Sequence, residues 1–153
     1  MFTLESLNLL PVSGFVDAIG DVFEHAPWVA EGAAGKRPFP TVAALHAAML
    51  DTAKASPAKR QLAFIRAHPE LGSKVKRADL TADSQAEQGG LGLDRLSEAE
   101  FQRFVKLNAA YRDKFGIPFI ICVRRHTRDS ILRQFERRLG NDDAVERDET
   151  VQQ

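Results

Sequence analysis

The sequence predicts an all-α protein, and three features carry that prediction. Apolar residues recur at helical spacing along most of the chain, as they do in residues 15–23. Side chains that cap helices precede several of these stretches, and glycine or proline follows them. Residues 117–123 alone have the composition of a strand, and the chain holds no second strand of similar quality. We therefore expect a single compact multi-helix domain spanning residues 1–153.

The expected helices are placed by their starts. An apolar lead-in occupies residues 4–10, and helices then begin near Ser13, Pro27, Thr41, Pro57, Thr81, Ser97, Thr127 and Asp142. Ser97 and Glu100 have the spacing of a capping box, in which each side chain accepts a hydrogen bond from the other's backbone amide. Gly116 is expected to end that helix, because glycine readily adopts the left-handed conformation that follows a helix.

Residues 117–123 are expected to form an extended buried connector between two helices. A lone strand would leave its backbone polar groups unpaired. We therefore expect some amides and carbonyls of this connector to be available to a ligand. Cys122 lies in this run and is the only cysteine, so it cannot form an intramolecular disulfide and is expected to be a small core residue.

The richest polar cluster is predicted within residues 62–93. A helix opens this stretch and should end at His68, because Pro69 restricts the residue before it to extended backbone. A short helix over residues 82–88 should then present Glu87 opposite the imidazole. A histidine beside a carboxylate can transfer protons near neutral pH. The alternative is a structural role for both residues, since such pairs also occur in packing networks and at helix ends.

Composition narrows the class of function. Lys and Arg together number 21, as do Asp and Glu, so the net charge is zero and neither nucleic acid nor an anionic membrane is an expected partner. No secretory leader and no long apolar stretch is visible, which leads us to expect a cytoplasmic protein. The four histidines lack the close spacing of metal ligands, so no metal site is expected.

Four motifs occur in a fixed order along the chain. They are His68-Pro69-Glu70-Leu71-Gly72, Ser84-Gln85-Ala86-Glu87-Gln88, Leu107-Asn108-Ala109-Ala110-Tyr111 and Phe115-Gly116-Ile117-Pro118-Phe119-Ile120-Ile121-Cys122-Val123-Arg124. In this order they closely resemble the OHCU decarboxylases, the 2-oxo-4-hydroxy-4-carboxy-5-ureidoimidazoline decarboxylases of the pathway from urate to allantoin. The resemblance covers nearly the whole chain, from about Leu7 to Gln153.

The resemblance implies a carboxy-lyase of purine catabolism that forms (S)-allantoin and CO2 without a metal or organic cofactor. It implies helices arranged around one cleft, a small-molecule substrate and a homodimer. It assigns catalysis to His68 and Glu87. It assigns substrate binding to Pro69, Ser84, Gln85, Ala86, Gln88, Phe119, Ile120, Ile121, Cys122 and Val123.

The end of the chain departs from the family pattern. Family members usually continue into a last helix with an arginine that reaches the active site, whereas this sequence stops at Gln153. We therefore expect residues 142–153 to be poorly ordered or frayed, because a short terminal helix without a packing partner is marginal. We name Arg66, Arg124 and Arg125 as substitute cations. The departure keeps two alternatives open: a non-catalytic helical module that binds a purine-derived ligand or a partner protein, and a structural half of a larger uricolytic assembly.

Overall fold

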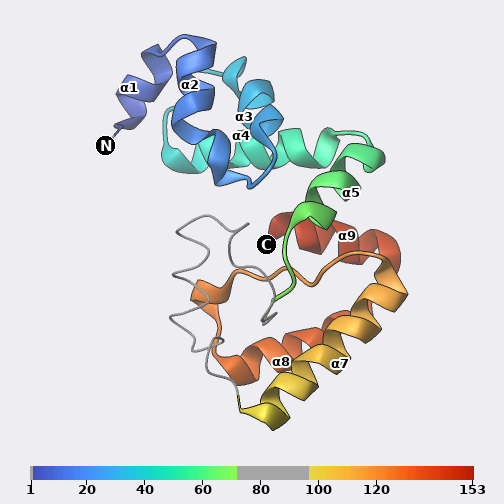
Figure 1. Ribbon diagram of the computed structural model, residues 1–153. Coiled ribbons are helices and arrows are strands. Elements are labelled where there is room, and N and C mark those ends of the chain that lie inside the picture. The colour runs from blue at the N-terminus through green and yellow to red at the C-terminus, as the bar shows by residue number, and fades with distance from the viewer. Residues whose placement is uncertain (1, 72–96) are drawn as a thin grey trace. The chain divides into compact units, whose positions relative to one another are not determined.

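The computed structural model describes residues 2–71 and 97–153, and the regular structure in these ranges is entirely helical. The chain divides into two compact units, Met1–Phe64 and Ile65–Gln153, and the boundary falls within α5. The first range holds α1 (Leu4–Leu9), α2 (Val12–Ile19), the 3-10 helix η1 (Gly20–Val22), α3 (Pro27–Ala34), α4 (Val42–Ala55) and α5 (Ala58–Ala67). The second holds α7 (Glu98–Phe115), the 3-10 helix η4 (Val123–Arg125), α8 (Arg128–Arg138) and α9 (Asp143–Gln152) (Figure 1). The all-α prediction is confirmed, whereas a single domain over residues 1–153 stays a prediction.

In the first unit, α3 packs against both α2 and α4. Phe15 and Val29 are fully buried between these helices. A Cβ atom built on Gly32 would lie 2.4 Å from Cγ2 of Thr52, so the absence of a side chain lets α3 approach α4 closely. The loop before α4 is attached to the N-terminal helix by Asn8, which donates to the carbonyl of Phe39 at 2.9 Å and accepts from its amide at 2.8 Å.

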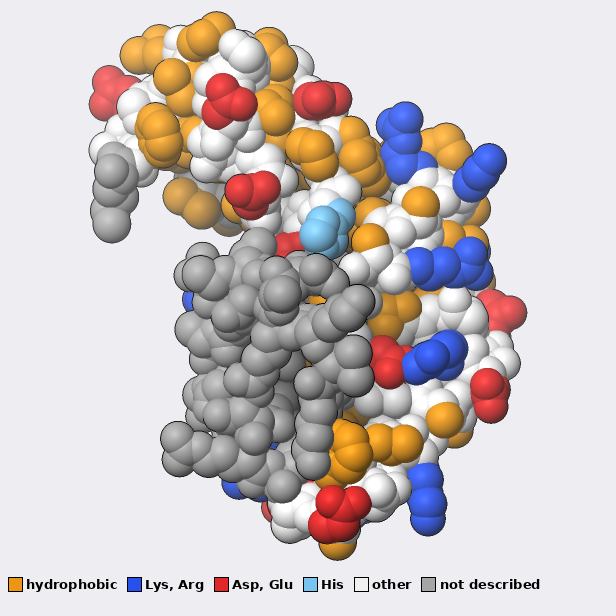
Figure 2. Space-filling model, in the orientation of Figure 1, with side chains coloured by type: hydrophobic (Ala, Val, Ile, Leu, Met, Phe, Trp, Pro, Cys, Tyr) orange, Lys and Arg blue, Asp and Glu red, His pale blue; other side chains and the backbone are white. Residues whose placement is uncertain are grey.

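Hydrophobic side chains are also exposed on the first unit. Leu9 is 82% exposed, and Val22 and Val42 are exposed as well. On the visible face of this unit, hydrophobic side chains are interspersed with acidic and uncharged ones (Figure 2). Scattered exposure of this kind is usual for globular proteins and indicates no particular partner.

Helix starts in the first unit test the capping predictions. The side chain of Thr41 caps α4 by accepting from the amide of Ala44, and Pro27 occupies the first turn of α3, as predicted. Ser13 was expected to cap α2, and this prediction is wrong, because the helix begins earlier at Val12 with Pro11 as its N-cap. Proline lacks an N–H, and the amide groups at a helix start have no intrahelical partner, so the helix can begin directly after Pro11.

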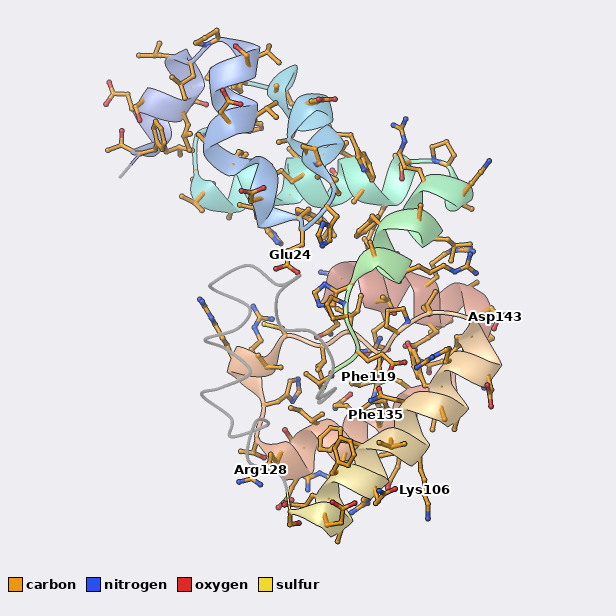
Figure 3. All side chains as sticks on the ribbon, in the orientation of Figure 1. Glu24, Lys106, Phe119, Arg128, Phe135 and Asp143 are labelled. Atoms are coloured by element: carbon orange, nitrogen blue, oxygen red, sulfur yellow. The ribbon has the colours of Figure 1, made fainter. Side chains whose placement is uncertain are left out.

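The second unit is built around aromatic rings. α7 and α8 lie side by side (Figure 1), and the capping boxes of Ser97 and Thr127 begin them. Phe119 of the connector stacks on Phe135 of α8 with 3.6 Å between ring centroids (Figure 3). Tyr111 of α7 meets the ring of Phe119 edge-on at 5.2 Å. These contacts fasten the connector to both long helices of the unit.

Residues 143–152 form a regular helix, α9, that is packed against the rest of the unit, so the expectation of a frayed end without a packing partner is wrong. Asp142 caps α9 by accepting from the amides of Ala144 and Val145. Glu146 and Thr150 are buried, with 1% and 3% of their surface exposed. Both side chains bind a buried arginine of α8, and that interaction gives the short helix its packing partner.

Candidate active site

His68 lies directly after the last turn of α5, as the sequence predicts. The helix ends at Ala67, and the amide of His68 still donates to the carbonyl of Ile65 at 3.1 Å. His68 and Pro69 are half-buried. Pro69 explains the end of the helix, because it disfavours the helical conformation at His68. The imidazole is therefore partly open to solvent directly after a helix end, while the backbone of His68 remains attached to the helix.

Helix α7 contacts the chain on both sides of His68. Nε of Arg66 donates to the carbonyl of Gly116 at 2.9 Å. Glu70 forms an ion pair with Arg112 of α7. One turn earlier on α7, the buried side chain of Asn108 donates to the carbonyl of Leu71 at 2.9 Å. Side chains on either side of His68 therefore contact α7 or the residue that follows it, and the backbone itself is held at Leu71.

The connector alternates between buried and half-buried side chains. Phe119, Ile121 and Val123 are buried, whereas Ile120 and Cys122 are half-buried, so the expectation that Cys122 is a core residue is only partly met. The pattern is that of extended backbone, in which successive side chains point to opposite sides. The segment forms no strand and enters η4 at Val123.

Two polar groups of the connector backbone are already engaged within the chain. The carbonyl of Ile120 accepts from Nη1 of Arg138 at 2.6 Å, and the amide of Cys122 donates to Oε1 of Gln153 at 3.1 Å. These two groups are therefore not available to a ligand, and the expectation that some other amides and carbonyls of the connector are available stays a prediction. These bonds instead fix the position of the connector.

Arg138 is the centre of a buried polar cluster that sequence reasoning missed. Its side chain is fully buried, with Nε donating to Oε1 of Glu146 at 2.8 Å and Nη2 donating to Oγ1 of Thr150 at 3.0 Å. Its guanidinium also lies 4.5 Å from the ring centroid of Phe119. A signal was present in the sequence, because Arg138 follows Phe135 by three residues and so belongs to the buried face of α8.

The cluster changes the titration of its neighbours. Burial, and then the hydrogen bond to Glu146, raise the pKa of the Tyr111 phenol well above its usual value. Partial burial opposes ionisation of Glu149, but the hydrogen bond from Arg137 and the charges of Arg138 and Arg137 outweigh it, so the pKa of Glu149 lies below its usual value. Tyr111 is therefore neutral and Glu149 is charged across the physiological range.

The candidate cations differ in their surroundings. Arg66 is exposed and holds the carbonyl of Gly116, so its guanidinium has a structural partner. Arg124 and Arg125 are exposed on η4, directly after the connector. These two residues therefore lie closer in sequence to the predicted substrate-lining segment than Arg66 does.

The second half of the predicted site lies outside the described residues. This applies to Thr81 and to Ser84, Gln85, Ala86, Glu87 and Gln88. The pairing of Glu87 with His68 therefore stays a prediction. Within residues 2–71 and 97–153, no three His, Cys, Asp or Glu side chains are grouped so that they could hold a metal ion. No helix in the described part of the chain is long and apolar enough to cross a membrane.

Comparison with known proteins gives one consistent result. A sequence model of the OHCU decarboxylase family matches residues 8–153. The chain is 40% identical over 144 residues to a 2-oxo-4-hydroxy-4-carboxy-5-ureidoimidazoline decarboxylase of Haloferax volcanii, covering 94% of this chain and 84% of the relative. It is 38% identical over 146 residues to the uric acid degradation bifunctional protein PucL of Bacillus subtilis, covering 95% of this chain and 29% of that protein.

A solved structure agrees with these relatives. The crystal structure of an (S)-allantoin synthase superimposes with a TM-score of 0.76 and 28% sequence identity, covering 99% of this chain. The chain spans 50% of the length of that synthase. The similarity thus extends over both units of the chain.

Proposed function

Because the chain belongs to the OHCU decarboxylase family, we propose that it converts 2-oxo-4-hydroxy-4-carboxy-5-ureidoimidazoline to (S)-allantoin and CO2. The observation that carries this proposal is the continuous match over residues 8–153 to relatives named for that reaction. The position of His68 supports it, since a half-buried imidazole follows the end of α5 where the family motif begins.

The reaction sets three requirements for a protein site. The bond between the ring carbon and the carboxylate breaks, CO2 leaves, and the electron pair passes into the ring. A proton must then reach the new stereocentre from one face only, because the product is a single enantiomer. The substrate carboxylate must also lie where losing its charge is favourable, which a partly desolvated site provides.

We assign the proton transfer to His68. An imidazole has an ordinary pKa of about 6.5, near the pH at which general acid–base catalysis is most efficient. We assign Glu87 to orienting this imidazole or to accepting a hydrogen bond from the substrate hydroxyl. Both assignments follow the family motif. An imidazole and a carboxylate can perform these roles when they lie within hydrogen-bond reach of their partners.

We assign substrate contacts to three short segments. Pro69 would pack against the substrate beside His68, and residues 119–123 would line it from the connector. Ser84 and Gln88, with Gln85 and Ala86 between them, would supply hydrogen bonds to the urea-like groups of the substrate. The half-buried state of Pro69, Ile120 and Cys122 supports this assignment, because these residues are partly open to solvent.

The proposal is tested by following optically active allantoin. Substrate generated immediately before use decays spontaneously, so the chain is added and circular dichroism records allantoin formation against a buffer control. We expect a faster reaction and an excess of the S enantiomer. A rate and a racemic product that match the buffer would refute the enzyme and favour the binding module.

We also propose a cytoplasmic homodimer without a nucleic acid or membrane partner. The family resemblance supports the dimer, and the balanced charge supports the choice of a small-molecule partner. Light scattering coupled to size-exclusion chromatography measures the mass directly. A mass of about 34 kDa, twice the 17.0 kDa chain, is expected, and a mass equal to one chain would refute the dimer.

A further inference from the structure

We propose that Asn108 is a positioning residue that acts through the backbone on which His68 is carried. The inference rests on the proposed role of His68 in proton transfer. It assigns no contact between Asn108 and the substrate. Its basis is the hydrogen bond from Nδ2 of Asn108 to the carbonyl of Leu71, three residues after His68.

The contact is one of three that residues 66–71 make with α7 and with Gly116, the residue directly after it. Asn108 and Arg112 are four residues apart, so they occupy successive turns of one face of α7, and Gly116 is the C-cap that follows the helix. The partners of these three residues follow one another in the opposite order along the chain. The pairs are Asn108 with Leu71, Arg112 with Glu70, and Gly116 with Arg66. The segment 66–71 therefore runs antiparallel to the last turns of α7, and His68 lies between the contacts.

Burial separates Asn108 from the other two contacts. The side chains of Arg112 and Glu70 are 57% and 27% exposed, and exposed ion pairs contribute little to holding a structure. Arg66 is exposed as well. Asn108 is only 7% exposed, so water competes least for its hydrogen bond to Leu71. Among the three, Asn108 is the contact best able to fix the backbone near His68.

The expected consequence is a loss of rate rather than of binding. General acid–base catalysis needs heavy atoms within about 3 Å of each other, so the imidazole must be held in a narrow range of positions. A misplacement of about 1 Å can cost about 100-fold in rate. If the carbonyl of Leu71 is released, His68 samples a wider range of positions, and kcat falls more than KM rises.

Asn108→Leu is the variant that tests this role. Leucine keeps the branched shape of asparagine and removes its donor. Oδ1 of Asn108 is buried and has no partner in the described part of the chain, so the substitution also removes an unpaired acceptor, which offsets part of the cost of leaving the carbonyl of Leu71 without its donor. Asn8→Leu is the matched control, because Asn8 makes two side-chain hydrogen bonds to the backbone of Phe39 in the first unit.

Two measurements are made on the full chain and both variants. Kinetics should show that Asn108→Leu lowers kcat by about 10-fold to about 100-fold and changes KM by less than about threefold, while Asn8→Leu keeps the wild-type kcat. Hydrogen–deuterium exchange should show faster exchange within residues 65–71 in Asn108→Leu and not in Asn8→Leu. Circular dichroism verifies that the helical content is retained.

The outcomes separate this inference from the proposed function. Wild-type kcat in a folded Asn108→Leu variant would overturn it, and so would equal losses of kcat in both variants, because the effect would then be general. If Asn108→Leu does not fold, Asn108→Ser, whose hydroxyl is too short to reach Leu71 in the same way, is judged by the same criteria. A wild-type chain without turnover refutes the proposed function, while unchanged exchange in residues 65–71 refutes the anchoring role of Asn108.

Discussion

Replacing Arg138 by methionine should destabilise the chain strongly, because it leaves the buried carboxylate of Glu146 without its counter-ion. Both side chains are almost completely removed from water, at 0% and 1% exposure. Removing one partner of such a pair costs about 3–5 kcal/mol, because the remaining charge stays desolvated. The substitution also takes away the donor to the carbonyl of Ile120. The free energy of unfolding of a typical domain is about 5–15 kcal/mol, so much of it would be lost.

Two unfolding experiments monitored by circular dichroism measure the loss: a urea titration and a thermal scan. A chain of this size loses about 2–4 °C in Tm for each kcal/mol, so a thermal scan should show a fall of at least about 6 °C for Arg138→Met. Arg103→Met is the control, because Arg103 pairs with Glu136 at the surface, where both side chains are more than half exposed. That control should cost less than about 1 kcal/mol.

A second variant tests the reason for the loss. When Glu146→Leu is added to Arg138→Met, both buried charges are gone, and much of the lost stability should return, because apolar replacements of buried ion pairs are often tolerated. A double-mutant cycle measures the coupling between Arg138 and Glu146 directly. An Arg138→Met chain no less stable than Arg103→Met would refute the reasoning.

Two further predictions concern stability. The folded-state pKa of Glu149 is depressed, so its ionised form stabilises the fold above its unfolded pKa of about 4.3, and this contribution is lost as the pH falls through the folded value. Urea titrations should therefore show Glu149→Gln less stable than wild type at neutral pH and equal to it in acid, and a difference independent of pH would contradict this. Gly116 has φ of 66°, where alanine is strained, and a Cβ would lie an ordinary 3.5 Å from Nη2 of Arg66. Gly116→Ala should therefore cost about 1–2 kcal/mol in the same titration, and an unchanged midpoint would contradict it.

Local features of the fold could be predicted because their causes lie within one turn of helix. Ser97 and Glu100 cap each other, Gly116 takes a positive φ, and Pro69 ends α5 after Ala67. Each outcome depends on backbone sterics or on a bond between residues three apart. The wrong prediction of Ser13 as the N-cap of α2 also has a local cause, because Pro11, two residues earlier, is the N-cap instead.

Contacts between distant residues could not be predicted in this way. The bond between Asn108 and Leu71 joins residues 37 apart, and that between Arg138 and Ile120 joins residues 18 apart. The spacing of apolar residues does not specify which polar groups of distant segments form hydrogen bonds with each other. The order of α9 was missed for this reason, since its buried Glu146 depends on Arg138 of another helix.

In the candidate site too, the local features could be predicted from the sequence, whereas the contacts between distant residues could not. The position of His68 at a helix end follows from its neighbour Pro69, and the structure confirms it. The extended connector was also predicted, because the sequence holds no second stretch with the composition of a strand that could pair with residues 117–123. The bonds that hold this connector in place were not predicted, since their partners, the donor Arg138 on α8 and the acceptor Gln153, lie far along the chain.

The rate of (S)-allantoin formation by His68→Asn, measured beside the wild-type chain, tests the role of His68 most directly. Asparagine keeps a hydrogen-bonding side chain but cannot exchange a proton near neutral pH. We expect an unchanged circular dichroism spectrum and a rate lower by about 100-fold or more, the size of a general acid–base contribution. A folded His68→Asn chain that forms (S)-allantoin at the wild-type rate would contradict the assignment of proton transfer to His68.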